Sequence, residues 1–153
     1  MKQPFKIIKY TPAWKQAYGD KYLDDTSLRL RHVEGEHGGK YKLTKKENLV
    51  PEKKGVCKIT TIYLSIVEFE LLGELKGVVI EKTRHVFVIG NNNVGVDVIE
   101  GGEGALYLAE VEFEAESEMN AFEIPVGYVK EVTGEQRYNG YELAEKYGRR
   151  EAP

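Results

Sequence analysis

Apolar and polar positions alternate with a period of two residues through most of the chain, and this pattern predicts strands separated by turns. The predicted strands span 5–10, 21–23, 27–33, 41–46, 56–64, 78–89, 94–99 and 106–114. Helical patterns are fewer. Ser65 stands three residues before Glu68, a capping-box spacing, and the stretch 66–75 that follows predicts a helix. Shorter helical pieces are expected before residue 21 and within 141–147.

Strands joined by glycine-rich turns, with few helices, indicate a mainly β protein of the α+β class. We expect a closed or nearly closed antiparallel β-barrel of eight strands with a few flanking helices. The length of 153 residues suits one domain with a real core, and no repeat or low-complexity linker divides it. The sequence therefore predicts a single domain over residues 1–153.

The composition limits the choice of partners and compartment. A net charge of -3 at pH 7 gives no overall attraction to nucleic acid or to an anionic membrane. Cys57 is the only cysteine, so the chain has no intramolecular disulfide and no cysteine-based metal site, which favours a reducing cytoplasm. We find no signal-peptide pattern and no apolar run near the roughly 20 residues that span a bilayer. We expect a cytoplasmic protein, and its apolar, tyrosine-rich strand faces leave a homodimer open.

Cations recur two or four residues apart on several predicted strands, and such residues lie on one face of a strand. They are Arg29 and Arg31, Lys42 and Lys46, and Lys82 and Arg84, with Lys9 as a further member from the first strand. Arginine forks and lysine point charges suit phosphate oxygens. A solvated strand face explains any one pair, but recurrence on separate strands favours a single charged interior that binds a polyphosphate.

Carboxylates in the C-terminal half of the chain also stand two residues apart. Glu110 and Glu112 are two apart, and Asp97 lies on the preceding predicted strand. Hard cations such as Mg²⁺ or Mn²⁺ prefer carboxylate and phosphate oxygens, so these three residues are candidate metal ligands. The alternative is that they form salt bridges with arginine or lysine across the sheet. The histidines show no ligand spacing, and we find no Ser/His/Asp set, P-loop or zinc motif.

Several of these segments, in this order, resemble the CYTH family, also called triphosphate tunnel metalloenzymes. The segments are YLDDTSLRLRHV (22–33), YKLTKK (41–46), IEKTRHVF (80–87), GVDVIEGGEGALYLAEVEFE (95–114) and KEVTGEQRYNGYELA (130–144). The resemblance implies a closed eight-stranded barrel whose tunnel holds a triphosphate, with basic residues on the phosphates and acidic residues on a divalent metal.

Carried over by position, the resemblance assigns roles to residues of this chain. The implied phosphate ligands are Lys9, Arg29, Arg31, Lys46, Lys82 and Arg84. Glu110 and Glu112 would be catalytic and, with Asp97, would hold Mg²⁺ or Mn²⁺. Glu131 would support the tunnel mouth or the water around the metal. The implied ligands are tripolyphosphate or a nucleoside or thiamine triphosphate.

The first strand departs from the family pattern. The family has E-x-E-x-K there, whereas this chain has FKIIK at 5–9, with Phe5 and Ile7 in the glutamate positions. Thr60 or Ile62 likewise stands where a middle-strand glutamate is usual. Losing carboxylates that hold metal should impair catalysis far more than phosphate binding.

Three functions therefore stay open. The first is a metal-dependent, triphosphatase-like phosphohydrolase, of which an adenylate cyclase is a variant. The second is a non-catalytic binding protein for a polyphosphate or nucleotide ligand, with catalysis lost along with the first-strand glutamates. The third is a β-domain whose charges only face water.

Overall fold

A computed structural model gives the structure of residues 14–35, 40–48, 50–101, 104–124 and 130–151. The predicted first strand, at 5–10, falls outside these residues. In the described part, the strands are β1 (Trp14–Leu23), β2 (Leu28–Gly35), β3 (Lys40–Glu47), β4 (Lys58–Leu64), β5 (Gly77–Ile89), β6 (Asn92–Gly101), β7 (Gly104–Val111) and β8 (Arg149–Glu151). The helices are α1 (Ile66–Gly73), α2 (Glu116–Ala121) and α3 (Gly140–Tyr147), with a 3₁₀ turn at Gln136–Tyr138.

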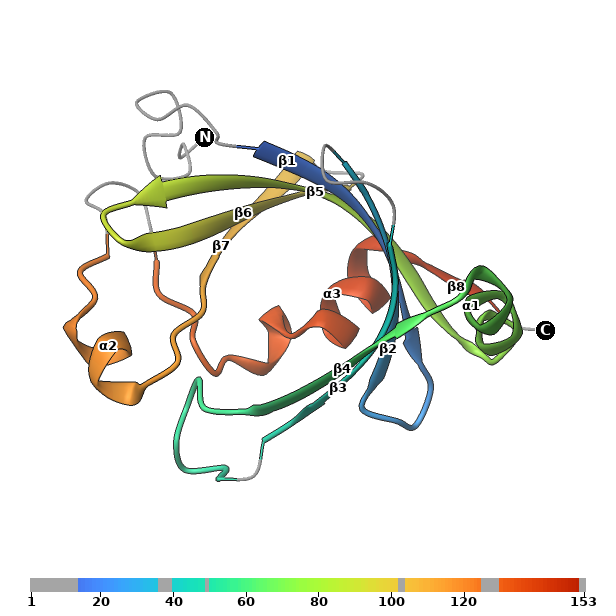
Figure 1. The fold of residues 1–153 in the computed structure, drawn as a ribbon, viewed down its shortest axis with the longest axis horizontal. Helices are drawn as coiled ribbons and strands as arrows, with labels where there is room; N and C mark the ends of the chain where they lie inside the picture. Colours follow the sequence, from blue (N-terminus) through green and yellow to red (C-terminus); the bar gives the residue numbers. More distant parts are fainter. Residues whose placement is uncertain (1–13, 36–39, 49, 102–103, 125–129, 152–153) are drawn as a thin grey trace.

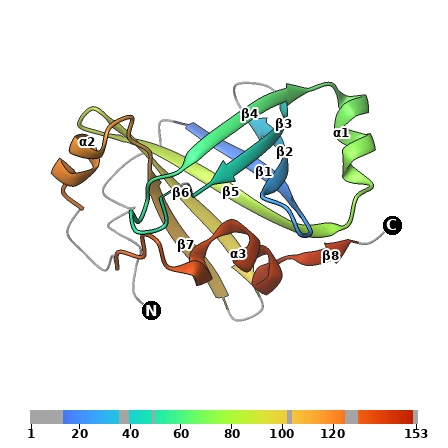
Figure 2. The same cartoon turned by 90° about the horizontal axis from the view of Figure 1, so that it is seen from below.

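The strands form one antiparallel sheet in the order β4-β3-β2-β1-β5-β6-β7. The short strand β8 pairs with the first residues of β5, Gly77–Val79, whereas β6 pairs with β5 from Thr83 onward. The sheet is strongly curved, and α3 lies on its concave side (Figure 1). Helices α1 and α2 lie at opposite ends of the molecule (Figure 2).

The expected closed barrel is wrong, because the sheet is open. Closure requires hydrogen bonds between the two outer strands. In the described residues, β4 pairs only with β3 and β7 only with β6. Helix α3 packs onto β5, β1 and β6, so a helix fills part of the space that a closed barrel would enclose.

The hydrophobic core joins α3 to the concave face of the sheet. Leu143 and Ala144 of α3 are buried against Val78, Ile80 and Ile99 of β5 and β6. These side chains occupy alternate positions on each strand, which places them on one face. A second buried cluster, Phe87, Val94 and Val96, includes residues at the intervening positions and is packed by Phe122 beside α2.

The segment 14–20 is a strand, and the expected helical piece there is wrong. Strand β1 begins at Trp14, well before the strand expected at 21–23. Its inward positions alternate aromatic and polar side chains, Tyr18 and Tyr22 with Gln16 and Asp20. The polar members are paired inside the sheet, so the usual apolar-in, polar-out signal is missing.

The predicted capping box at the start of α1 is confirmed. The Glu68 amide donates to Ser65 Oγ at 3.2 Å, and the Ser65 amide donates to Glu68 Oε1 at 2.7 Å. These reciprocal bonds satisfy two amides that a helix start leaves free. Helix α2 has no counterpart in the sequence-based expectation. None of the helices in the described residues is long and apolar enough to cross a membrane.

Candidate functional site

The strand register brings the cation pairs onto the concave face of the sheet. Lys82 and Arg84 follow Val78 and Ile80 at intervals of two, and those valine and isoleucine side chains pack against α3. Directly opposed residues of neighbouring strands share a face. Arg31 lies opposite Asp20, and Arg84 opposite Asp97, so cations of β2 and β5 meet carboxylates of β1 and β6.

Six of these side chains form a chain of alternating charge that we call the paired cluster. Its members, in spatial order, are Arg31, Asp20, Lys82, Asp97, Arg84 and Glu110. Their formal charges, three positive and three negative, sum to zero. The paired cluster therefore adds rigidity to the concave face but no net attraction for an anion.

Both aspartates of the paired cluster hold an arginine with two bonds. Arg31 donates from Nε and Nη2 to Asp20 at 2.6 and 2.8 Å, and Arg84 donates in the same way to Asp97 at 2.6 and 2.8 Å. Lys82 Nζ lies 2.9 Å from Asp97 Oδ2 and 3.9 Å from Asp20 Oδ2. Bidentate arginine–carboxylate pairs are strong and fix orientation.

Burial and ion pairing act in opposite directions on these carboxyl groups. Burial alone would raise the pKa of Asp20, but the hydrogen bond and charge of Arg31 outweigh it and hold the pKa below its usual value. The same balance, with Arg84 and Lys82 as the cations, lowers the pKa of Asp97. Both aspartates are therefore ionised at neutral pH.

Tyr18 lies beneath the cations of the paired cluster. The Arg31 guanidinium carbon is 3.9 Å from the centre of its ring, the Arg84 carbon 5.1 Å and Lys82 Nζ 5.9 Å. Its hydroxyl donates to Gln16 Oε1 at 2.8 Å. An aromatic face attracts cations without neutralising their charge. Tyr18 thus orients three cations that sequence patterns alone did not connect.

A second group of cations has no such compensation, and we call Arg29, Lys40 and Lys42 the open basic half. Among the residues that the structure describes, none of the three has a carboxylate within 4.0 Å. Lys42 lies directly opposite Arg31. Burial and the positive charges of Arg31, Lys40, Arg29 and Arg84 lower the pKa of Lys42. The local potential here is positive.

Arg29 and Tyr63 complete this region. Arg29 Nε is buried and finds no hydrogen-bond acceptor in the described part of the chain. Buried donors are normally satisfied, so this nitrogen indicates a missing acceptor. On the outer strand, the ring of Tyr63 has Lys40 Nζ at 5.6 Å and Lys42 Nζ at 5.5 Å.

The described carboxylates do not fit a resident Mg²⁺ or Mn²⁺ site in this arrangement. Both oxygens of Asp97 accept hydrogen bonds from Arg84, and Glu110 Oε2 lies 3.2 Å from the same guanidinium. Glu112 is exposed and follows the end of β7 at Val111. Within the described ranges, no group of three or more His, Cys, Asp or Glu side chains could hold a metal ion. Asp97 and Glu110 instead form salt bridges with Arg84, which is the alternative to metal binding that the sequence left open.

Two of the solved structures similar to this chain are of one protein, NE1496. One structure, of the inorganic triphosphatase NE1496, has a TM-score of 0.52 and 25% identity, covering 88% of this chain and 84% of its own. The other, described as the hypothetical protein NE1496, has a TM-score of 0.53 and 25% identity, covering 90% of this chain and 89% of its own. This chain shares its fold with an inorganic triphosphatase. That likeness supports the fold expected from the family resemblance, apart from closure of the barrel.

A further similar structure supports the fold alone. PH1819 from Pyrococcus horikoshii OT3 has a TM-score of 0.56 and 21% identity, covering 72% of this chain and 71% of its own. No protein-family model matches the chain, and no curated protein matches it significantly.

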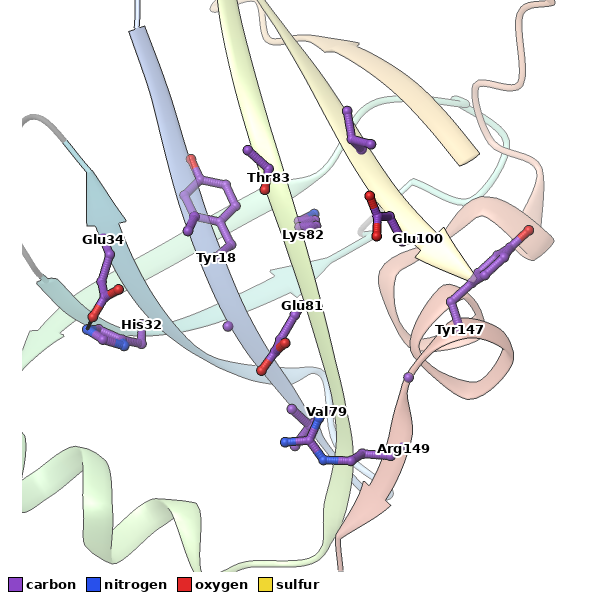
Figure 3. Close-up of a pocket in the computed structure, with 14 residues that line it drawn as sticks. Tyr18, His32, Glu34, Val79, Glu81, Lys82, Thr83, Glu100, Tyr147 and Arg149 are labelled. Carbon is purple, nitrogen blue, oxygen red and sulfur yellow. Dashed lines mark ion pairs between the residues drawn. The ribbon is translucent and has the colours of Figure 1, made fainter. Parts of the chain in front are cut away.

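A groove of about 680 Å³ lies on the other side of the sheet (Figure 3). Its lining includes Ala17, Gly19 and Thr83, which alternate with the residues of the concave site. It also includes three glutamates, of which Glu34 lies 3.6 Å from His32 Nε2. The lining also includes Arg149 and Lys82, so its charges nearly balance, and the groove is a weaker anion site than the open basic half.

The structure thus gathers part of the predicted site. Arg29, Arg31, Lys82, Arg84, Asp97 and Glu110 share the concave face. Lys46 and Glu131 are exposed, and Lys9 lies outside the described residues. Their roles, and the metal roles of Asp97, Glu110 and Glu112, stay predictions.

Sequence reasoning missed Tyr18, Asp20, Lys40 and Tyr63 as members of the site. The spacing of Tyr18, Asp20 and Tyr22, two residues apart, was the available signal for the first two.

Proposed function

We propose that this protein binds a tripolyphosphate or another phosphorylated small molecule on the concave face, with the open basic half as the main anion site. One observation carries the proposal: Lys42 lies opposite Arg31 with a lowered pKa and cations around it. Like charges directly opposite each other destabilise a sheet. A bound polyanion removes that repulsion and supplies the acceptor that Arg29 Nε lacks.

The two groups of cations then have different tasks. Arg31, Lys82 and Arg84 are neutralised by carboxylates at short range, so they mainly keep the face rigid. Arg29, Lys40 and Lys42 have no carboxylate at ion-pair distance among the described residues, and only Arg29 acts at longer range on Asp20, so their remaining charge attracts an anion. The likeness to NE1496, an inorganic triphosphatase, supports tripolyphosphate as the first compound to test.

Hydrolysis is the second candidate, and the likeness to an inorganic triphosphatase favours it. A resident metal would have to be held by Glu110, Glu112 and Asp97. Two of those carboxylates are engaged by Arg84, which is why we place binding ahead of hydrolysis.

The test of binding compares two lysines of β3. Lys42 faces the concave site, whereas Lys45 is exposed, lies on the opposite face and is 3.5 Å from Glu47. A charge-assisted hydrogen bond contributes about 1.5–3 kcal/mol, so Lys42→Gln should weaken tripolyphosphate binding about tenfold to a hundredfold in calorimetry. Lys45→Gln should leave the affinity within about twofold, because a remote surface charge acts only through a screened field. An equal loss in both variants would contradict a defined site.

The same samples decide between binding and hydrolysis. Phosphate release from tripolyphosphate is measured with Mg²⁺, Mn²⁺ or a chelator, in the parent protein and in Glu110→Gln. Metal-dependent release that Glu110→Gln abolishes would establish hydrolysis. Calorimetric binding with no release under any of these conditions would establish a binding protein.

A further inference from the structure

Two threonine side chains lie beside the open basic half, and we call them the hydroxyl pair. Thr44 of β3 and Thr61 of β4 are directly opposed, and their Oγ1 atoms are 2.9 Å apart. On its other side Thr44 is directly opposite Arg29 of β2. Directly opposed residues share a face, so the hydroxyl pair lies on the concave face with Arg29.

Burial decides which of the two threonines has a hydrogen left to donate. Thr44 is 5% exposed, whereas Thr61 is exposed. In the described part of the chain, the Thr44 hydroxyl bonds to Thr61 alone. Buried donors are normally satisfied, so Thr44 acts as the donor of this bond and Thr61 as the acceptor. The hydroxyl hydrogen of Thr61 then stays available for a ligand.

Arg29 supplies a second unused donor in the same row of residues. Its buried Nε has no acceptor among the described residues. On the side away from Thr44, Arg29 is directly opposite Tyr22, and a Cβ added at Gly140 would collide with the Tyr22 hydroxyl. The start of α3 therefore fills the concave face on that side. A ligand reaches the row from the side of β3 and β4, where Thr61 is exposed.

We propose that Thr61 is a specificity-determining residue of the anion site, and that its hydroxyl donates to one phosphoryl group of a polyphosphate chain lying along β3. This inference rests on the proposed function and deepens it. Lys42 and Lys46 stand two residues to either side of Thr44 on the same face of β3, each about 7 Å along the strand. A chain that follows β3 thus has a cation on each side of the hydroxyl pair, and its middle group lies at Thr61.

The position of the hydroxyl pair favours a linear chain over a single phosphate. From Lys42 to Lys46 an extended strand covers about 13 Å. A single phosphate at Thr61 leaves at least one lysine without a direct contact, whereas a chain of phosphoryl groups contacts the hydroxyl and both lysines. A neutral donor adds a directed bond without adding charge. Thr61 therefore selects the anion by its length and shape.

Calorimetry with tripolyphosphate gives the first test. Thr61→Val keeps the shape of the side chain but removes the hydroxyl, and it should weaken binding about fivefold to tenfold. Thr61→Ser restores the hydroxyl and should bind within about twofold of the parent. Thr60→Val is the matched control, because Thr60 is an exposed residue of the same strand on the opposite face, and it should also stay within about twofold. Equal losses in Thr61→Val and Thr60→Val, or in Thr61→Val and Thr61→Ser, would overturn the proposal.

A double variant guards this test against loss of stability. Thr61→Val leaves the buried Thr44 hydroxyl without an acceptor, so its thermal melt is compared with that of the parent. Thr44→Val/Thr61→Val leaves no such hydroxyl and should show the same fivefold to tenfold loss of affinity. Parent-like affinity in the double variant would show that Thr61 does not contact the ligand.

Salt dependence and phosphorus NMR separate the hydroxyl from the lysines. Salt screens the attraction between charges but has little effect on a bond from a neutral hydroxyl. Lys42→Gln should therefore make the affinity for tripolyphosphate less dependent on NaCl, and Thr61→Val should leave that dependence unchanged. In the NMR spectrum of bound tripolyphosphate, Thr61→Val should shift the middle phosphorus resonance more than the terminal one. A shift of the terminal resonance alone would overturn the placement along β3.

Failure of this inference and failure of the proposed function give different results. Where the parent binds tripolyphosphate and Lys42→Gln weakens that binding, but Thr61→Val behaves like Thr60→Val, the anion site stands and the role of Thr61 is refuted. Where the parent binds neither tripolyphosphate nor orthophosphate, both proposals are refuted together.

Discussion

Replacing Asp97 by asparagine tests whether the paired cluster holds the concave face together. The Asp97 side chain is fully buried and pairs with Arg84 through two bonds and with Lys82 at 2.9 Å. Asparagine keeps the shape and one acceptor oxygen but removes the charge. The variant leaves two cations in the interior with one counter-ion fewer.

The expected loss follows from the burial of those cations. Removing one partner of a buried ion pair destabilises a protein by about 3–5 kcal/mol. The Lys82 and Arg84 side chains are 10% and 16% exposed, and Arg84 keeps Glu110 at 3.2 Å, so water and that carboxylate relieve part of the penalty. We expect the lower end, about 3 kcal/mol, or a fall of about 6–12 °C in Tm for a domain of this size.

Urea unfolding followed by circular dichroism measures this loss, with and without tripolyphosphate. The freed cations of Asp97→Asn add to the positive potential of the face, so tripolyphosphate should stabilise the variant more than the parent. Glu110→Gln is the control: its side chain is 45% exposed, and its loss should be below about 1 kcal/mol. Equal, small losses in both variants would refute a structural role for the paired cluster. A smaller gain from tripolyphosphate in Asp97→Asn would refute the charge argument.

Two further predictions concern pH and backbone packing. The folded pKa values of Asp20 and Asp97 are lowered, so the stabilisation that these two carboxylates supply is present above the unfolded pKa, near 4, and is lost as pH falls below it. Urea titrations between about pH 6 and 2 should show the free energy of unfolding falling with pH. Asp20→Asn should make that fall smaller. A Cβ at Gly148 would collide with a backbone carbonyl of β5, whereas a Cβ at Gly19 meets open space. Gly148→Ala should therefore lower Tm by several degrees and Gly19→Ala should not, and equal thermal melts would contradict this packing.

The two-residue spacing of charged side chains correctly predicted which cations lie on the concave face, for a physical reason. In an antiparallel sheet, residues two apart keep one face, and the register carries that face across to the next strand. Arg29 with Arg31, and Lys82 with Arg84, therefore converge as the spacing indicated. The capping box of Ser65 was equally readable, because both of its partners lie within one helical turn.

Closure of the barrel and the extent of β1 could not be read in this way. Closure depends on how the sheet twists and on what fills its concave side, and α3 does so through Leu143 and Ala144. The inward face of β1 carries Asp20, whose counter-ion Arg31 comes from the next strand. A pattern that scores only apolarity treats such an inward carboxylate as an exposed one.

The concave face separates stability from affinity by group of side chains. In the paired cluster each cation has a carboxylate, so a substitution such as Asp97→Asn acts on folding. In the open basic half, Arg29 and Lys42 lack such a close carboxylate, so Lys42→Gln acts on ligand binding and relieves repulsion in the free protein. The two variants should then move in opposite directions. Lys42→Gln should weaken tripolyphosphate binding without loss of stability, and Asp97→Asn should lose stability while gaining more from the same ligand. A common fall in both properties would mean that the face acts as one electrostatic unit.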